Sequence, residues 1–104
     1  MTKLPEGLIA TTLATTYTVE LTGAGPHLDE FNEMLRMTVV RRGPGCWSID
    51  RQAYCLSVTG EWDWGRSLDH EDDWFQAHWF ALDDAIQRAQ AEALRMYENF
   101  LERT

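Results

Sequence analysis

The sequence has few basic residues. Nine Lys and Arg stand against seventeen Asp and Glu among 104 residues, which gives a formal charge of −8. Proteins that bind nucleic acids or anionic membranes neutralise phosphates with clustered Lys and Arg, so this composition disfavours both kinds of partner. No apolar run approaches the roughly 20 residues of a membrane helix. The stretch 1–7 has one Lys and no apolar signal core, which predicts a cytoplasmic protein.

Cysteine and histidine are scarce as well. Cys46 and Cys55 are the only thiols, and their spacing of nine positions matches neither a CxxC motif nor a zinc knuckle. The three histidines lie in separate segments, so a four-ligand zinc site would need residues from distant parts of the chain. We expect two reduced thiols and no structural metal.

Motifs of enzyme active sites are also missing. The chain has no GxSxG sequence, no P-loop and no GxGxxG fingerprint. Cys55 could pair with His70 or His78 as nucleophile and base, but no motif or orienting residue supports that pair. We therefore expect no enzymatic activity and no cofactor.

The residues that are present predict one folded domain over 1–104. Hydrophobic residues make up 44% of the chain and aromatic residues 12%, which is enough for a core. Alternation of apolar and polar residues predicts antiparallel strands at about 9–22, 34–42, 46–50 and 53–64. The stretch 27–35 is interpreted as a loop with one short turn, although its Leu and Phe have helical spacing.

The loop between the third and fourth predicted strands should have an even length. An even loop keeps Trp47, Ile49 and Leu56 on one face, whereas an odd loop would move one apolar set into water. A two-residue loop at Asp50 and Arg51 would place Cys46 opposite Cys55. A four-residue loop over 50–53 is an equal alternative and separates the two sulfurs.

A long helix is predicted at about 82–102. Apolar residues recur there at intervals of three and four, which forms a single stripe. Asp83 and Asp84 fall in the first turn, where the helix dipole favours negative charge. Such a helix must cover something, so we expect an α+β fold in which a three- to four-stranded antiparallel sheet is covered by this helix.

The segment 61–84 concentrates both charge and aromatic rings. It holds eight acidic residues and one basic residue, so it carries a charge of −7 of the −8 total. It also contains four of the five tryptophans. One interpretation is that the rings close one end of the core while the acids are solvated. A second is a protein-binding surface, because Trp is enriched at interface hot spots and acids select a basic partner.

A third interpretation of this segment is a metal site. Oxygen ligands crowd at 69–73, but their spacing matches neither an EF-hand nor an HExxH motif. We expect no metal there.

Part of the chain resembles a known group of proteins. The run 55–64 (CLSVTGEWDW), followed by Asp73-Trp74, His78-Trp79-Phe80 and 82–85 (LDDA), is similar to small uncharacterised proteins of actinobacteria and their phages. That group has a Gly-Glu-Trp turn and a His-Phe or Arg-Phe entry into a C-terminal helix. The resemblance covers about 47–89 and departs from the group at 65–67. It implies a small accessory protein and carries no known activity.

These observations lead to one functional hypothesis. We expect a small acidic, non-enzymatic module that binds a protein with a basic patch, and a phage-encoded effector of a host protein fits the resemblance. The predicted anchors and orienting acids lie within 61–79; they are Trp62, Asp63, Trp64, Asp69, Asp72, Asp73 and Trp74. One alternative is a nucleic-acid mimic that inhibits a DNA-binding protein. Another is a homo-oligomer formed through an exposed edge strand or through uncovered tryptophans.

Overall fold

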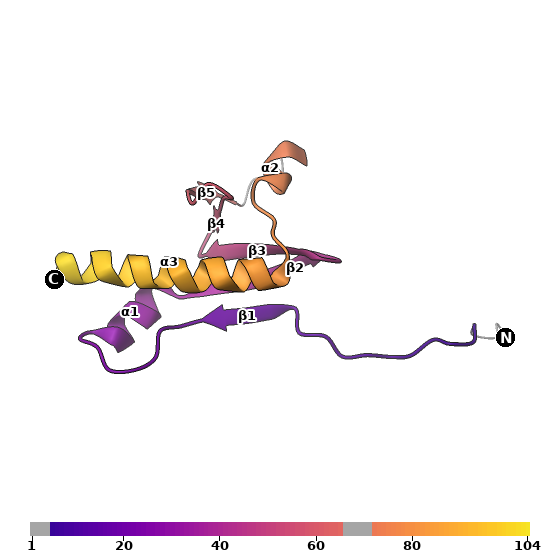
Figure 1. Cartoon of the computed structure of the whole chain (residues 1–104), viewed down its shortest axis with the longest axis horizontal. Coiled ribbons are helices and arrows are strands. Elements are labelled where there is room, and N and C mark those ends of the chain that lie inside the picture. The colour runs from indigo at the N-terminus through magenta and orange to yellow at the C-terminus, as the bar shows by residue number, and fades with distance from the viewer. Residues whose placement is uncertain (1–4, 66–71) are drawn as a thin grey trace.

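A computed structural model describes residues 5–65 and 72–104, together with the side chains of this part except those of residues 72 and 73. The fold is α+β: a five-stranded antiparallel sheet lies against one long helix (Figure 1). The strands follow one another in the sheet in chain order. The elements are β1 (Thr16–Val19), α1 (Leu28–Leu35), β2 (Met37–Gly43), β3 (Cys46–Arg51), β4 (Tyr54–Leu56), β5 (Trp62–Trp64), α2 (Asp72–Gln76) and α3 (Leu82–Glu102).

The α3 helix has the bounds that the sequence predicts. Its small residues Ala85, Ala89 and Ala93 are buried, which lets the helix backbone approach the sheet closely. The helix packs on β1, β2 and β3. Between these layers lies the core, formed by Phe31, Met37, Val39, Trp47, Ile49, Leu56, Phe80, Ala85, Ala89, Ala93 and Met96. None of the described helices combines the length and the apolar character needed to cross a membrane.

The first strand is much shorter than predicted. The alternation over 9–22 predicts one strand, but only Thr16–Val19 pair with β2. Thr16 lies opposite Val40, so residues before Leu13 would have to pair beyond Gly43, where β2 ends. A register shift between Arg41 and Gly43 also interrupts this end of β2. The length of a strand depends on its partner as well as on its own pattern, and here the partner ends first.

The predicted loop over 27–35 is wrong over most of its length, because Leu28–Leu35 form α1. Phe31 is buried in the core and its ring packs edge-on against Tyr97 and Phe100. A helix of two turns is marginal alone, so this tertiary packing stabilises it. The side chain of Asn32 also accepts from the Leu21 N–H at 2.9 Å and donates to the Leu21 carbonyl at 2.8 Å.

The prediction of an even loop between β3 and β4 is confirmed. The loop has two residues, Gln52 and Ala53, and Gln52 adopts a left-handed backbone with φ 56°. This loop lies later in the chain than a loop at Asp50 and Arg51, which would have placed Cys46 opposite Cys55. Asp50 is therefore the partner of Cys55, and both Cys46 and Cys55 are free thiols.

The predicted single strand over 53–64 is two strands. A turn separates β4 from β5, and Gly60 takes a φ of 88° that favours glycine. The Ser57 hydroxyl accepts a hydrogen bond from the Glu61 N–H at 3.0 Å, which closes the turn. This turn raises the strand number from the expected three or four to five.

The chain returns to the sheet just before α3. Trp47 and Phe80 exchange two backbone hydrogen bonds of 2.8 Å in an isolated bridge. Val58 also donates to the Ala77 carbonyl at 2.8 Å. These bonds fix the segment 77–80 beside β3 and the end of β4, and so determine where the aromatic residues of 74–79 lie.

Candidate functional site

The β5 strand divides the predicted acidic-aromatic surface between two faces of the sheet. Successive side chains of a strand point to opposite faces, so Trp62 and Trp64 share one face and Asp63 lies on the other. Trp64 is 53% exposed, and Trp62 is half-buried. Equal sequence patterns thus give these two tryptophans different environments.

Trp62 is held by a hydrogen-bonded network on α3. Its indole Nε1 donates to Glu92 Oε1 at 3.2 Å, and the guanidinium of Arg51 lies 4.8 Å from the centre of its ring. Arg95 forms an ion pair with the same carboxylate. Burial by itself raises the pKa of Glu92, but the hydrogen bonds from Arg95 and Trp62 outweigh it and hold that pKa below its ordinary value. Trp62 therefore joins β5 to α3.

Trp64 and Tyr54 form an exposed aromatic pair. Their ring centres are 5.6 Å apart at an angle of 82°, which is an edge-to-face contact, and Tyr54 is 39% exposed. Tyr54 is the cross-strand partner of Trp64 in β4. The sequence pattern predicts Tyr54 only as a strand residue, since its proximity to Trp64 depends on the turn at Gly60. Both rings are among the exposed large hydrophobic side chains of the described residues.

β5 is the last of the described strands in the sheet. Gly65, which follows it, donates to the Ala53 carbonyl of the preceding strand region at 2.8 Å. The direction of hydrogen bonds alternates along an antiparallel strand, so the N–H and C=O groups of Trp62 and Trp64 point away from β4.

Asp63 holds the segment that follows α2. His78 is 3% exposed, and its Nε2 lies 2.7 Å from Asp63 Oδ2. Its Nδ1 lies 2.6 Å from the Trp74 carbonyl oxygen, and its ring stacks on the indole of Trp74 at 3.9 Å. Both neighbours accept hydrogen bonds, so each ring nitrogen donates to one of them when both carry protons. Asp63 and Trp74 thus both contact the buried side chain of His78, and the sequence pattern did not predict His78 as a partner of either residue.

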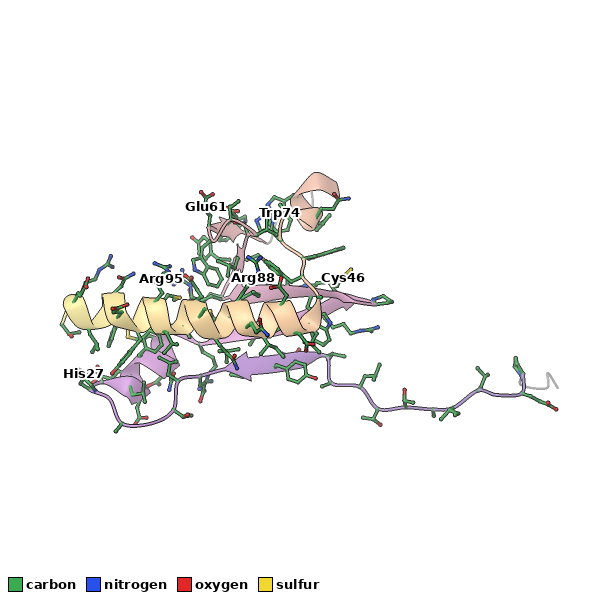
Figure 2. All side chains as sticks on the ribbon, in the orientation of Figure 1. His27, Cys46, Glu61, Trp74, Arg88 and Arg95 are labelled. Atoms are coloured by element: carbon green, nitrogen blue, oxygen red, sulfur yellow. The ribbon has the colours of Figure 1, made fainter. Side chains whose placement is uncertain are left out.

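The other acidic residues of the predicted surface lie outside β5. Asp69 lies outside the described residues, and for Asp72 and Asp73 only the backbone is described, as the start of α2. Glu61 is exposed, and Figure 2 shows it at the same end of the molecule as Trp74. Of the predicted set, the structure brings Asp63 and Trp74 together on one face and presents Trp64 on the other.

A small cavity of about 110 Å³, lined by both polar and aromatic side chains, lies on the Asp63 face of the sheet. Arg42, at a β-bulge in β2, donates to Ser48 at 2.9 Å and to Asp50 at 2.6 Å. The Cys55 thiol donates to the other carboxylate oxygen of Asp50 at 3.2 Å. Sequence patterns did not single out Arg42 or Asp50, because the bulge that aligns them leaves no local signal.

Cys55 and His78 line this cavity together, but their chemistry does not suit a nucleophile and base. Burial first, and the Asp50 carboxylate second, raise the pKa of the Cys55 thiol to about 12. A thiol at that pKa is protonated at neutral pH and is a poor nucleophile. Both nitrogens of His78 are already engaged by Asp63 and Trp74, so neither is available to accept the thiol proton.

The described residues hold no group of three or more His, Cys, Asp or Glu side chains arranged to bind a metal ion. Three of the five residues of the candidate metal segment, 69–71, lie outside the described part of the chain. Comparisons with protein-family models, curated proteins and solved structures gave no match to this chain.

Proposed function

We propose that this protein is a small, non-enzymatic protein-binding module whose contact surface is the exposed Tyr54–Trp64 pair on β4 and β5. The exposure of Trp64 is the observation that carries the proposal. A large aromatic ring that is half in water, supported edge-on by a second ring, resembles the anchors at the centre of protein interfaces. Its neighbour Trp62 is fixed to α3, so the anchor stands on an ordered strand.

The partner is proposed to contribute a surface that carries apolar and basic side chains. The apolar side chains would pack on the rings of Tyr54 and Trp64. The charge of −7 over 61–84 would attract a basic patch and repel an acidic one. In this proposal Asp69, Asp72 and Asp73 supply long-range attraction, while Asp63 and Trp74 position His78.

The proposed biological setting is the cytoplasm of a bacterial host. The resemblance to small proteins of actinobacteria and their phages fits an effector that acts on a host protein. Two free cysteines fit a reducing cytoplasm.

Capture of interacting proteins from a host lysate, followed by affinity measurement, tests the proposal. Trp64→Ala should weaken binding of a captured protein by about 2 kcal/mol, or roughly 30-fold in Kd. Leu94→Ala is the matched control, because Leu94 is 61% exposed on α3, and it should bind as the wild type does. A captured protein that binds W64A as tightly as the wild type would contradict the proposal.

Charge substitutions test the electrostatic part. The double variant Asp72→Asn, Asp73→Asn should reduce recovery of the partner, and added salt should reduce it further. A complex that ignores both changes would exclude steering by these acids. Competition between the partner's DNA and this protein would favour the nucleic-acid mimic instead.

A further inference from the structure

Residues 5–15 form an extended arm that leaves the body of the protein, as Figure 1 shows. Three of its apolar side chains, those of Leu8, Ile9 and Leu13, are 68%, 83% and 64% exposed. The molecule measures 65 × 33 × 20 Å, and the arm contributes to the longest of these extents. The radius of gyration is 17.2 Å, compared with about 13 Å for a compact chain of this length.

Residues 5–14 of the arm pair with no strand among the described residues. The last backbone hydrogen bond between β2 and the arm runs from the Arg41 N–H to the Thr15 carbonyl. β2 ends at Gly43, and the arm continues the direction of β1 past the tip of the β2–β3 hairpin. The apolar side chains of the arm therefore gain nothing from the fold of a single copy.

The outer side of β1 is equally open. β1 is an edge strand, and the bond at Thr15 shows that odd-numbered residues bond to β2. Even-numbered residues such as Thr16 and Thr18 therefore direct their N–H and C=O groups outward. Residues 8–19 contain no charged residue and no proline, although the chain carries a charge of −8. Natural edge strands are normally protected by such residues, and this one is not.

The side-chain pattern of the arm matches the core face of the sheet. Ile9 and Leu13 have the same parity as Tyr17 and Val19. Tyr17 lies on the face that α3 covers, with its ring 5.6 Å from that of Trp47, and it is still 38% exposed. An arm in extended conformation beside a second β1 would place Ile9 and Leu13 on this same face.

We propose that the arm and β1 pair antiparallel with the arm and β1 of a second copy. In each copy, the arm and β1 form an unprotected sheet edge and also supply a strand that can pair with the same edge of the other copy. The contact is therefore self-complementary, and the two copies are related by a two-fold axis. Even-numbered residues bond to even-numbered residues, because those carry the outward groups. The two five-stranded sheets become one continuous sheet, and each arm crosses the edge of its partner. The absence of charge over 8–19 allows two chains of like charge to approach here.

A pair of proline variants tests this arrangement. Thr12→Pro removes an outward N–H, whereas Thr11→Pro removes one that points to the opposite side. Both positions are exposed and lie outside the core, so both variants should keep the wild-type circular dichroism spectrum. Sedimentation of the full chain should give twice the chain mass of 12.0 kDa for the wild type and for T11P. T12P should sediment as the single chain.

Two results would overturn the proposal. One is a wild-type protein that sediments at 12.0 kDa at every concentration examined. The other is a dimer that responds equally to T11P and T12P, because only one of the two removed N–H groups faces the second copy. Trp64→Ala should leave the dimer intact, so failure of the binding surface at β5 and failure of this contact at β1 are separate outcomes.

Discussion

The indole of Trp62 in β5 donates a hydrogen bond of 3.2 Å to the carboxylate of Glu92 in α3, thirty positions later in the chain. Glu92 is 9% exposed, and it also binds Arg95. This contact attaches the last strand to the helix, and Trp64 lies two residues further on in that strand. The charge on Glu92 is thus tied to the position of the strand that carries Trp64.

Glu92 should stabilise the protein in a pH-dependent way. Its pKa is lower in the folded chain than in the unfolded chain, so its contribution is complete above the unfolded pKa and is lost as the pH falls through the folded pKa. Glu92→Gln should lower the free energy of unfolding by about 2 kcal/mol at neutral pH, and the difference from the wild type should narrow in acid. Urea unfolding at several pH values measures this. Glu98→Gln, on an exposed residue of the same helix, should show little change.

The Cys55 thiol should resist modification in the folded protein. Its pKa of about 12 leaves little thiolate at neutral pH, and the side chain is buried. Iodoacetamide followed by peptide mass spectrometry should show Cys46 labelled before Cys55, and equal labelling once the chain is unfolded. Rapid native labelling of Cys55 would contradict the described hydrogen bond to Asp50.

Removal of His78 should loosen the segment after α2. His78→Ala deletes the contacts to Asp63 and to the Trp74 carbonyl, which should cost about 2–3 kcal/mol of unfolding free energy. Hydrogen exchange should accelerate at 74–79 more than at β3. Asp83→Asn changes an exposed acid nearby and should leave both measurements unchanged. Equal acceleration throughout the sheet would argue against a local role.

The close approach of α3 to the sheet should not tolerate larger side chains. Ala89 is 0% exposed, so Ala89→Leu should destabilise the fold by about 1–3 kcal/mol through overpacking. Ala91→Leu adds the same atoms on an exposed position of the helix and serves as the control. Thermal or urea unfolding measures both, and equal stability of the two variants would contradict the packing.

The features that could be predicted are those that depend on nearby residues in the sequence. The bounds of α3 follow from its own apolar stripe, and the even β3–β4 loop follows from the need to keep Ile49 and Leu56 on one face. The end of β1 depends on where β2 stops, and α1 depends on a pocket for Phe31 supplied by α3. Neither is a local property, so neither was predicted.

The candidate site shows the same division. The concentration of tryptophan and acid over 61–84 was evident, but the environments of its members were not. Trp62 and Trp64 have the same parity on the same strand and differ because only Trp62 meets Glu92. Asp63 acquired a buried histidine fifteen positions away as its partner. Such pairings depend on the turn at Gly60 and on the return of the chain at Phe80.

The placement of α3 over β1, β2 and β3 has a consequence for local opening. The β4–β5 hairpin extends away from this body, toward α2 (Figure 1). It is linked to the remainder by the β3 ladder, by the burial of Leu56 in the core and by side-chain contacts at Trp62 and His78. The end of the hairpin that carries Tyr54 and Trp64 can therefore open at a lower free energy than global unfolding requires, while Leu56 and the helix-covered strands remain assembled. Adjustment of the Tyr54–Trp64 pair to the shape of a partner would then leave the stability of the main core nearly unchanged.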